Sequence, residues 1–246
     1  MADSPPKISI IIPTLQEEKY LSRTLEPFSK SLKERFNLDI IVSDGGSSDC
    51  TVTIARTRVD QVIEYKGTQR QTISMGRNIG ANHAGGDILL FLNADTIIEQ
   101  PERFFRMIGE IMKKPSVVAA TCKVNIYPEE ELFSDKIFHE FFNYYFWLLN
   151  IIGIGMGRGE CQIVRRTAFF SINGYNESMA AGEDFNLFIR LRRLGKIAFM
   201  RSLIVRESPR RFRKFGYKKI IFQWLVNSIS VLLRGKSISD HWEPIR

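Results

Sequence analysis

The chain has 246 residues, of which 44% are hydrophobic and 25% are charged; this balance excludes a disordered or fibrous protein and predicts one large α/β domain or, less simply, two small ones. Lys and Arg (35) outnumber Asp and Glu (27), and the resulting charge of +8 predicts anionic partners without separating nucleic acids, phosphorylated small molecules and acidic membrane surfaces. The cysteines Cys50, Cys122 and Cys161 are far apart and form no CxxC pair, which argues against a disulfide framework or a structural zinc site.

The N-terminal residues lack the basic segment and the apolar run of a signal peptide, so we expect a cytoplasmic protein. Residues 7–12 are apolar and β-branched, end at a proline and predict a central strand. Residues 17–36 carry apolar side chains at helical spacing, and Pro27 is expected to kink or split that helix. A second strand is predicted at 38–43, directly before Asp44.

Strands and helices continue to alternate along the chain. Further strands are predicted at 61–65, 87–92, 117–124 and 197–205, and helices at 51–56, 69–84, 101–113 and 182–195. Because the strands are apolar on both faces, the predicted fold class is α/β, with a mostly parallel central sheet flanked by helices. In such sheets ligands bind beyond the carboxyl ends of the strands, where Thr14, Asp44 and Asp95 are expected to lie.

Two later segments are rich in large apolar side chains. Residues 138–147 hold seven aromatic residues, and residues 217–234 are apolar on two sides of a predicted helix that basic residues flank. We therefore expect a domain over 1–216 and a C-terminal amphipathic helix and tail over 217–246. Such a helix fits an anionic membrane surface, a domain-closing role or a dimer contact, and the sequence leaves these alternatives and the oligomeric state open.

Two phosphate-binding motifs are absent. The turn after the first predicted strand reads PTLQEE and contains no glycine, so the GxGxxG motif of dinucleotide-binding folds is missing there. The P-loop pattern GxxxxGK[ST] is also missing. The sequence therefore gives poor support to hydride transfer or P-loop chemistry.

Four other segments occur in order along the chain: IIIPTLQEE, VSDGGSSDCT, GRNIGANHAGGDILLFLNADT, and NGYNE followed by GEDFNLFIRLRRLGK. With these segments the chain resembles the family 2 glycosyltransferases of the GT-A fold over about residues 7–215. The resemblance implies an inverting enzyme that moves a sugar from a UDP- or GDP-linked donor to an acceptor hydroxyl or phosphate.

The segment Asn93-Ala94-Asp95 matches the D-x-D signature of that family, with asparagine in place of the first aspartate. The resemblance implies that Asp95 contacts a divalent cation, Mg²⁺ or Mn²⁺, which neutralises the donor diphosphate. It places Asn93 and Ala94 in the same nucleotide-sugar site, where the Asn93 amide can still bond a ribose hydroxyl. A carboxylate at position 95 can instead cap the following turn.

The resemblance also implies a nucleoside pocket. Asp44 matches the family acid that contacts the base, and Pro13, Thr14 and Glu17 are expected to line the same pocket. An Asp-Gly pair such as the one at Asp44 also favours a plain turn, so this alternative stays open.

Three basic or amide side chains match positions that contact the base or the diphosphate in the family. Arg77 and Asn78 follow one another in the third segment, and a solvated helix face is their alternative. Arg211 belongs to a basic run that loosely matches a motif near the acceptor and the diphosphate. A guanidinium group suits phosphate binding, and a surface basic run is the alternative for Arg211.

Glu183 and Asp184 match the acid pair of the family, in which the aspartate acts as general base on the acceptor hydroxyl. Acids in the first turn of a helix also stabilise the helix by themselves, so a structural role is the alternative. The apolar, basic C-terminal helix favours a lipid or polyisoprenyl-phosphate acceptor and a peripheral position on the cytoplasmic face of a membrane, and nucleic acid is not expected as a partner. The competing classes are a sugar-nucleotide nucleotidyltransferase and a non-catalytic nucleotide-binding module.

Overall fold

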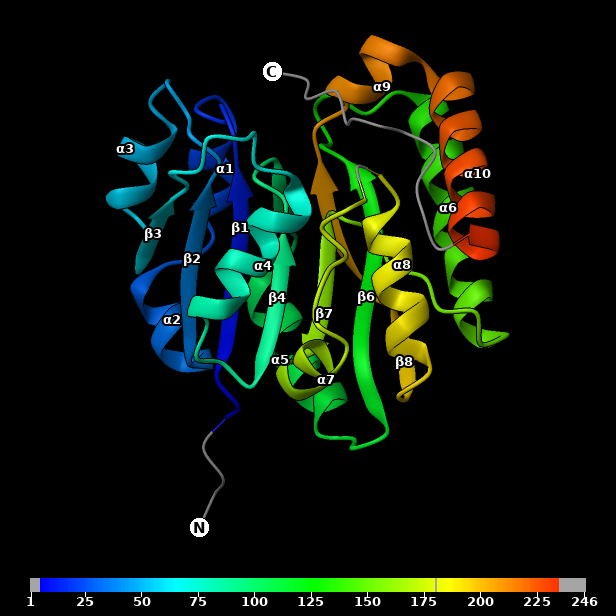
Figure 1. The fold of residues 1–246 in the computed structure, drawn as a ribbon, viewed down its shortest axis with the longest axis horizontal. Helices are drawn as coiled ribbons and strands as arrows, with labels where there is room; N and C mark the ends of the chain where they lie inside the picture. Colours follow the sequence, from blue (N-terminus) through cyan, green and yellow to red (C-terminus); the bar gives the residue numbers. More distant parts are fainter. Residues whose placement is uncertain (1–4, 180, 235–246) are drawn as a thin grey trace.

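The computed structural model describes residues 5–179 and 181–234 of the chain. Within these residues eight strands form one sheet in the order β3-β2-β1-β4-β7-β6-β8-β5, with helices on both faces (Figure 1). The strands are β1 (Ile8–Thr14), β2 (Leu38–Asp44), β3 (Gln61–Glu64), β4 (Ile88–Leu92), β5 (Thr96–Ile98), β6 (Val117–Ile126), β7 (Cys161–Arg165) and β8 (Lys196–Glu207). The helices are α1 (Leu21–Leu25), α2 (Lys30–Phe36), α3 (Thr51–Arg56), α4 (Ile73–His83), α5 (Pro101–Met112), α6 (Phe133–Ile151), α7 (Arg166–Ser171), α8 (Glu183–Arg192), α9 (Arg210–Phe215) and α10 (Tyr217–Arg234).

The half of the sheet formed by β3, β2, β1 and β4 is parallel and covered on both faces. In β1, Ile10 and Ile12 belong to the core under α1, α2 and α5, whereas Ile11 belongs to the core under α4, α7 and α8. A strand buried on both faces needs apolar residues at every position, which explains the continuous apolar runs in the sequence. The predicted α/β class is confirmed.

The helical pattern of residues 17–36 is divided as predicted from Pro27. Helix α1 ends at Leu25, and α2 begins at Lys30 after the N-cap Ser29, whose hydroxyl accepts a hydrogen bond from the backbone N–H of Leu32 (3.3 Å). The proline between them lacks the N–H group that a continuous helix would use.

Strand β7 was not predicted, and it shapes the functional edge of the sheet. It runs antiparallel between β4 and β6, so its first residue, Cys161, lies at the edge where β4 ends. The residues before it, 158–160, therefore reach the carboxyl edge at which ligands bind in α/β sheets. The segment CQIVR is a weak strand signal because it is short and follows a glycine-rich segment.

The aromatic segment forms α6, which lies beside α10 at one edge of the molecule (Figure 1). Phe138 and Phe142 of α6 contact Trp224 of α10, with ring centroids 5.8 and 5.2 Å apart. Helix α10 also contacts α8 and α9. The division of the chain at residue 216 stays a prediction, and residues 235–246 of the predicted tail lie outside the described residues.

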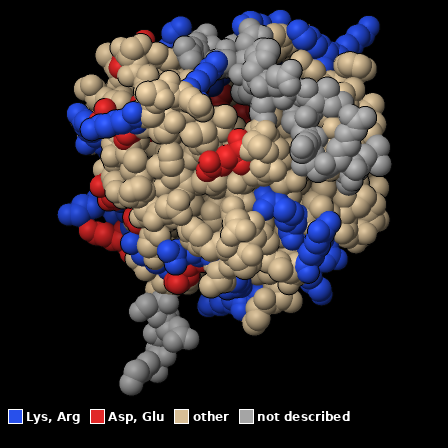
Figure 2. All heavy atoms as spheres, in the orientation of Figure 1, with Lys and Arg blue, Asp and Glu red and all other residues tan. Residues whose placement is uncertain are grey.

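Exposed apolar side chains concentrate on these two helices. Fourteen large apolar side chains are exposed in the described part of the chain, and thirteen of them lie on α6, on its two flanking residues or on α10. Among the described helices, none combines the length and the hydrophobicity needed to cross a bilayer. Figure 2 shows Lys and Arg side chains along the upper edge of the molecule, the end at which α9 lies in Figure 1.

Candidate active site

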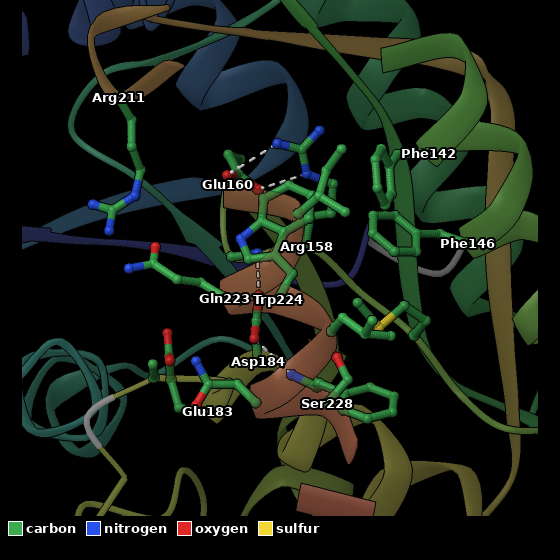
Figure 3. A pocket seen from close by; sticks show the side chains of 18 of the residues that line it. Phe142, Phe146, Arg158, Glu160, Glu183, Asp184, Arg211, Gln223, Trp224 and Ser228 are labelled. Atoms are coloured by element: carbon green, nitrogen blue, oxygen red, sulfur yellow. Dashed lines mark hydrogen bonds and ion pairs between the residues drawn. The ribbon is translucent and has the colours of Figure 1, made fainter. Parts of the chain in front are cut away.

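A cavity of about 680 Å³ lies between the carboxyl edge of the sheet and the helices α6 and α10 (Figure 3). Its size falls within the range of small-molecule sites. One wall is apolar and includes Phe142, Phe146 and Trp224. The opposite side is polar and carries Arg77, Asn93, Arg158, Glu160, Glu183, Asp184 and Glu207.

Asp184 lines this cavity from the first turn of α8. Gly182 precedes the helix with φ of 72°, a left-handed conformation that glycine adopts without strain. Asp184 Oδ2 accepts a hydrogen bond from the backbone N–H of Gly159 (3.1 Å), and Oδ1 accepts one from that of Phe185 (2.8 Å). Burial, and then the charge of Glu183, raise the pKa of Asp184 to about 7. A carboxylate that titrates near neutrality is suited to general-base catalysis.

Arg77 is completely buried next to the acid pair, so the solvated helix face considered as its alternative is wrong. Its Nη1 donates to Glu183 Oε1 (2.9 Å), and its Nη2 donates to Asn93 Oδ1 (3.0 Å) and to the carbonyl oxygen of Gly159 (2.8 Å). The guanidinium carbon lies 5.1 Å from the ring centroid of Tyr175. Arg77 therefore joins α4 to the end of β4, to the segment before β7 and to the start of α8.

Asn93 and Ala94 follow β4 and differ in what they offer to a ligand. Asn93 lines the cavity, and its Oδ1 is held by Arg77. Ala94 is buried, and its carbonyl oxygen accepts a hydrogen bond from Thr24 Oγ1 (2.7 Å). Ala94 thus fixes the turn, whereas the Asn93 side chain reaches the cavity.

The positive partner of Asp95 in the structure is Arg210, from the start of α9. Arg210 Nη2 lies 3.0 Å from Asp95 Oδ2 and donates to Glu17 Oε1 (2.8 Å). Burial raises the pKa of Asp95, and the charge of Arg210 opposes that shift only in part. Asp95 does not line the large cavity, although Asn93 two residues earlier does. The two acids on Arg210 form a group beside the cavity.

The residues present fit a divalent cation only as a one-carboxylate site. Within residues 5–179 and 181–234, no group of three or more His, Cys, Asp or Glu side chains could hold a metal ion. Asp95 offers one carboxylate at the sheet edge, and Mg²⁺ and Mn²⁺ in such sites are completed by phosphate oxygens and water. Arg210 Nη1 is buried with no hydrogen-bond partner among the described residues, so the same place also offers a donor for an anionic ligand.

Asp44 organises the loop after β2 in this structure. Its Oδ1 accepts hydrogen bonds from Thr14 Oγ1 (2.8 Å) and Ser47 Oγ (2.6 Å), and its Oδ2 accepts from the backbone N–H groups of Gly46 (2.9 Å) and Ser47 (2.7 Å). These four donors fill the acceptor positions of the carboxylate. Contact between Asp44 and a base therefore requires one of these donors to move, and this contact stays a prediction. The expectation that Pro13 lines the nucleoside pocket also stays a prediction.

Asn78 does not reach the cavity. Its Oδ1 accepts from the backbone N–H of Tyr175 (2.9 Å), and its Nδ2 donates to the Tyr175 carbonyl (3.0 Å) and to Glu177 Oε1 (2.8 Å). The predicted contact of Asn78 with the donor has no support in this geometry, because the amide already holds the loop after α7. Arg211 does line the cavity, from α9.

A largely buried charged cluster in the cavity wall was not predicted from the sequence. Arg158 Nε and Nη2 donate to the two carboxylate oxygens of Glu160 (3.1 and 3.2 Å), and Nη2 also donates to Glu207 Oε1 (2.5 Å). Burial, together with the charge of Glu160, raises the pKa of Glu207 well above its usual range. Burial and the nearby Arg158 lower the pKa of His139 to about 3, so this histidine is neutral. In the sequence, only the glycine-rich segment before β7 marks this region, and it does not indicate that Arg158 would meet residues of α6 and β8.

The family model described as glycosyl transferase family 2 matches residues 9–171. The chain is 31% identical over 98 residues to the dolichyl N-acetyl-alpha-D-glucosaminyl phosphate 3-beta-D-2,3-diacetamido-2,3-dideoxy-beta-D-glucuronosyltransferase of Methanococcus voltae, a match that covers 38% of this chain and 30% of that protein. The first curated relatives are longer proteins, and the matches span 15% to 30% of their length.

Solved structures share the fold. The mannosyltransferase PcManGT from Pyrobaculum calidifontis, in complex with GDP-Man and Mn²⁺, has a TM-score of 0.74 at 17% identity, over 94% of this chain and 65% of that one. The glucosyl-3-phosphoglycerate synthase from Mycobacterium tuberculosis, in complex with Mn²⁺, UDP and phosphoglyceric acid, has a TM-score of 0.60 at 16% identity, over 93% and 78% of the two chains. At these identities the likeness establishes the fold, and the predicted GT-A fold is confirmed.

Proposed function

Because the chain belongs to glycosyl transferase family 2, we propose that it is a glycosyltransferase that moves a sugar from a UDP- or GDP-linked donor to an acceptor. The observation that carries the proposal is the setting of Asp184, a half-buried carboxylate that lines the same cavity as Asn93 and whose pKa is raised to about 7 by desolvation and by the charge of Glu183. The nearby group of Asp95, Glu17 and Arg210 gives the edge of the sheet a second set of charges, suited to a diphosphate.

The proposed reaction is a single displacement with inversion. Asp184 takes the proton of the acceptor hydroxyl while the acceptor oxygen forms a bond to the anomeric carbon of the donor sugar. The bond from that carbon to the diphosphate oxygen breaks, and the nucleoside diphosphate leaves with the electron pair. The loop of Thr14 and Asp44 would hold the nucleoside, and Arg210 would donate to the diphosphate through Nη1, which has no partner among the described residues.

A divalent cation, Mg²⁺ or Mn²⁺, is part of the proposal, with Asp95 as the protein ligand. When bound, it would neutralise charge on the departing diphosphate. Two proteins of the same fold were solved with Mn²⁺, which supports this choice of cofactor. For the cation to reach Asp95, the Arg210 contact at 3.0 Å has to loosen.

We further propose a lipid-linked acceptor and a peripheral position on the cytoplasmic face of a membrane. Phe141, Tyr145, Ile221 and Leu225 all line the cavity and are also exposed, so the apolar outer surface of α6 and α10 continues into the cavity. Lys218 and Lys219 are exposed at the start of α10, and each basic residue near an anionic leaflet contributes about 1 kcal/mol. The relative from Methanococcus voltae is named for a dolichyl-linked acceptor, which supports the same class.

The membrane proposal is tested by co-sedimentation with vesicles that contain an anionic phospholipid. Phe222 is 66% exposed on α10, and Phe222→Ser is expected to lower the bound fraction, because a phenylalanine ring contributes a large apolar area to an interface. Leu194→Ser is the matched control, since Leu194 is 49% exposed but lies outside both helices. Equal binding of the two variants and the unchanged protein would reject the membrane surface and leave the transfer proposal in place.

The transferase proposal is tested by a screen of UDP- and GDP-sugars with Mn²⁺, in which release of the nucleoside diphosphate is measured. Thermal shifts with UDP, GDP and ATP, each with and without Mn²⁺, provide the binding readout. Stabilisation by a nucleoside diphosphate that depends on Mn²⁺, together with turnover of one donor, is the expected result. Binding without turnover would favour a non-catalytic nucleotide-binding module, and reaction of a nucleoside triphosphate with a sugar phosphate would favour a nucleotidyltransferase.

A further inference from the structure

The buried guanidinium of Arg77 joins three segments that are far apart in the sequence. Its partners are Asn93 after β4, the carbonyl of Gly159 before β7, and Glu183 at the start of α8. Its side chain is 1% exposed, so these contacts are made without competition from water. Charged hydrogen bonds in a buried setting are strong and directional, which makes this arrangement rigid.

The peptide groups around Gly159 connect Arg77 to Asp184. The carbonyl oxygen of Gly159 accepts from Arg77 Nη2, and the N–H of the same residue donates to Asp184 Oδ2. A methyl group at position 159 would lie 3.1 Å from Arg77 Nη2 and 3.6 Å from Asp184 Oδ2. The absence of a side chain there lets the backbone approach both groups.

Arg77 also sets the orientation of the Asn93 amide. Because Asn93 Oδ1 accepts from Arg77, the NH₂ end of that amide is left to donate to other groups. Asn93 lines the cavity, so it offers donors to a bound molecule. An aspartate at this position would offer acceptors instead.

The charges around Asp184 come from every element that borders it. Glu183 belongs to the same helix and opposes ionisation of Asp184, whereas Arg77 from α4 favours it. The remaining charged groups that line the cavity are Arg158 and Glu160 before β7, Glu207 at the end of β8, Arg211 from α9 and Lys219 from α10. Of these, Glu160 also opposes ionisation of Asp184.

We infer that Arg77 is a positioning residue that couples the two sides of the site: it holds Asp184 through Gly159 and Glu183, and it turns the Asn93 amide so that its N–H groups face the donor substrate. The inference rests on the proposed glycosyl transfer for the roles of the two partners. It assigns to Arg77 no contact with the substrate, unlike the base or diphosphate contact expected from the sequence. The sugar donor would then meet hydrogen-bond donors, not acceptors, at position 93.

The test compares Arg77→Lys and Arg77→Met with the unchanged protein. The lysine keeps the positive charge but cannot bond three partners in one plane, so kcat is expected to fall at least about tenfold while the pKa of Asp184 stays within about half a unit. The methionine removes the charge that favours the Asp184 carboxylate, so the pKa of Asp184 and the acidic limb of the kcat/KM profile are expected to rise by about one unit. Glu183→Gln removes a negative charge, so it is expected to lower the pKa of Asp184 and the acidic limb of the kcat/KM profile.

Arg165 supplies a matched control for loss of stability. It is an arginine that donates to the carbonyl oxygens of Met112 (2.7 Å) and Val117 (3.1 Å), at the opposite end of β7. Arg165→Met is expected to leave the Asp184 pKa and kcat unchanged in the folded fraction. Should Arg77→Met fail to fold, Arg77→Lys and Glu183→Gln carry the test.

The Asp184 pKa is also measured directly, by NMR titration of ¹³C-labelled carboxyl groups, with Asp184→Asn to assign the signal. This readout needs no turnover. If the protein transfers no sugar, the proposed function is wrong, but the Asp184 pKa in the Arg77 variants still tests the positioning role of Arg77. Wild-type kcat in Arg77→Lys, or an unchanged Asp184 pKa in Arg77→Met, would overturn the inference.

Discussion

Two arginines neutralise acids at the carboxyl edge of the sheet, and they do so in different ways. Arg77 is 1% exposed and is fixed between Glu183, Asn93 and Gly159. Arg210 is 17% exposed and holds two acids, Glu17 and Asp95, through one nitrogen, while its other terminal nitrogen has no partner among the described residues. Both terminal nitrogens of Arg77 thus have partners and only its Nε lacks one among the described residues, whereas a terminal nitrogen of Arg210 can still donate to another anion.

The difference follows from the elements that carry the two side chains. Arg77 belongs to α4, which packs on β1 and β2 inside the molecule. Arg210 stands at the start of the short helix α9 and lines a second cavity of about 200 Å³ beside the β1 turn. A functional edge can thus combine a rigid part that positions the proposed general base with a part whose ion pairs are free to rearrange when a charged ligand arrives.

The largest expected effect concerns stability. Arg77→Met leaves Glu183 buried without its cation, and the free energy of unfolding is expected to fall by about 3–5 kcal/mol. Arg210→Met removes hydrogen bonds to charged groups at a more exposed position, and the expected loss is about 2 kcal/mol or less. Urea unfolding of both variants is the measurement. Equal losses would remove the distinction between the two sites.

The next effect concerns cation binding without nucleotide. Arg210→Gln removes a positive charge 3.0 Å from Asp95, and we expect Mn²⁺ to bind about tenfold more tightly at pH 8, a change of about 1.4 kcal/mol. Isothermal titration calorimetry with Mn²⁺ alone measures it. Arg165→Gln is the control and is expected to bind Mn²⁺ as the unchanged protein does. Weaker binding in Arg210→Gln would contradict an exchangeable ion pair at Asp95.

The smallest expected effect concerns Asn78, the residue that follows Arg77 in the sequence. Asn78→Ala removes hydrogen bonds to Tyr175 and Glu177, so the free energy of unfolding is expected to fall by about 1 kcal/mol. The KM for the donor is expected to stay the same, because the Asn78 amide does not line the cavity. A KM that rises severalfold would restore the donor contact expected from the sequence.

Local patterns in the sequence predicted the parallel half of the fold. The β1 and β4 strands are continuous apolar runs, and the break at Pro27 divides α1 from α2 as expected. The position of β7 was not predictable in the same way, because it depends on pairing with β4 and β6 across many residues of chain. A strand of five residues carries too little periodicity to reveal such pairing.

The candidate site was predictable as a set of residues but not as a set of contacts. Acids after strand ends pointed to the correct edge, and Asp184 with Asn93 does line one cavity. The partner of Asp95 is an arginine 115 positions later in the sequence, and no spacing rule connects those two residues. The same holds for Arg158 and Glu207, which meet only because β8 ends beside the segment before β7.

In the proposed reaction Asp184 acts as the general base, and other residues bind the nucleoside diphosphate. The most direct test of these roles is Asp184→Asn, with donor binding and sugar transfer measured on the same sample. We expect Mn²⁺-dependent binding of the nucleoside diphosphate as in the unchanged protein and a fall in kcat of roughly 10²–10⁴-fold. Full transfer activity in Asp184→Asn would contradict the account.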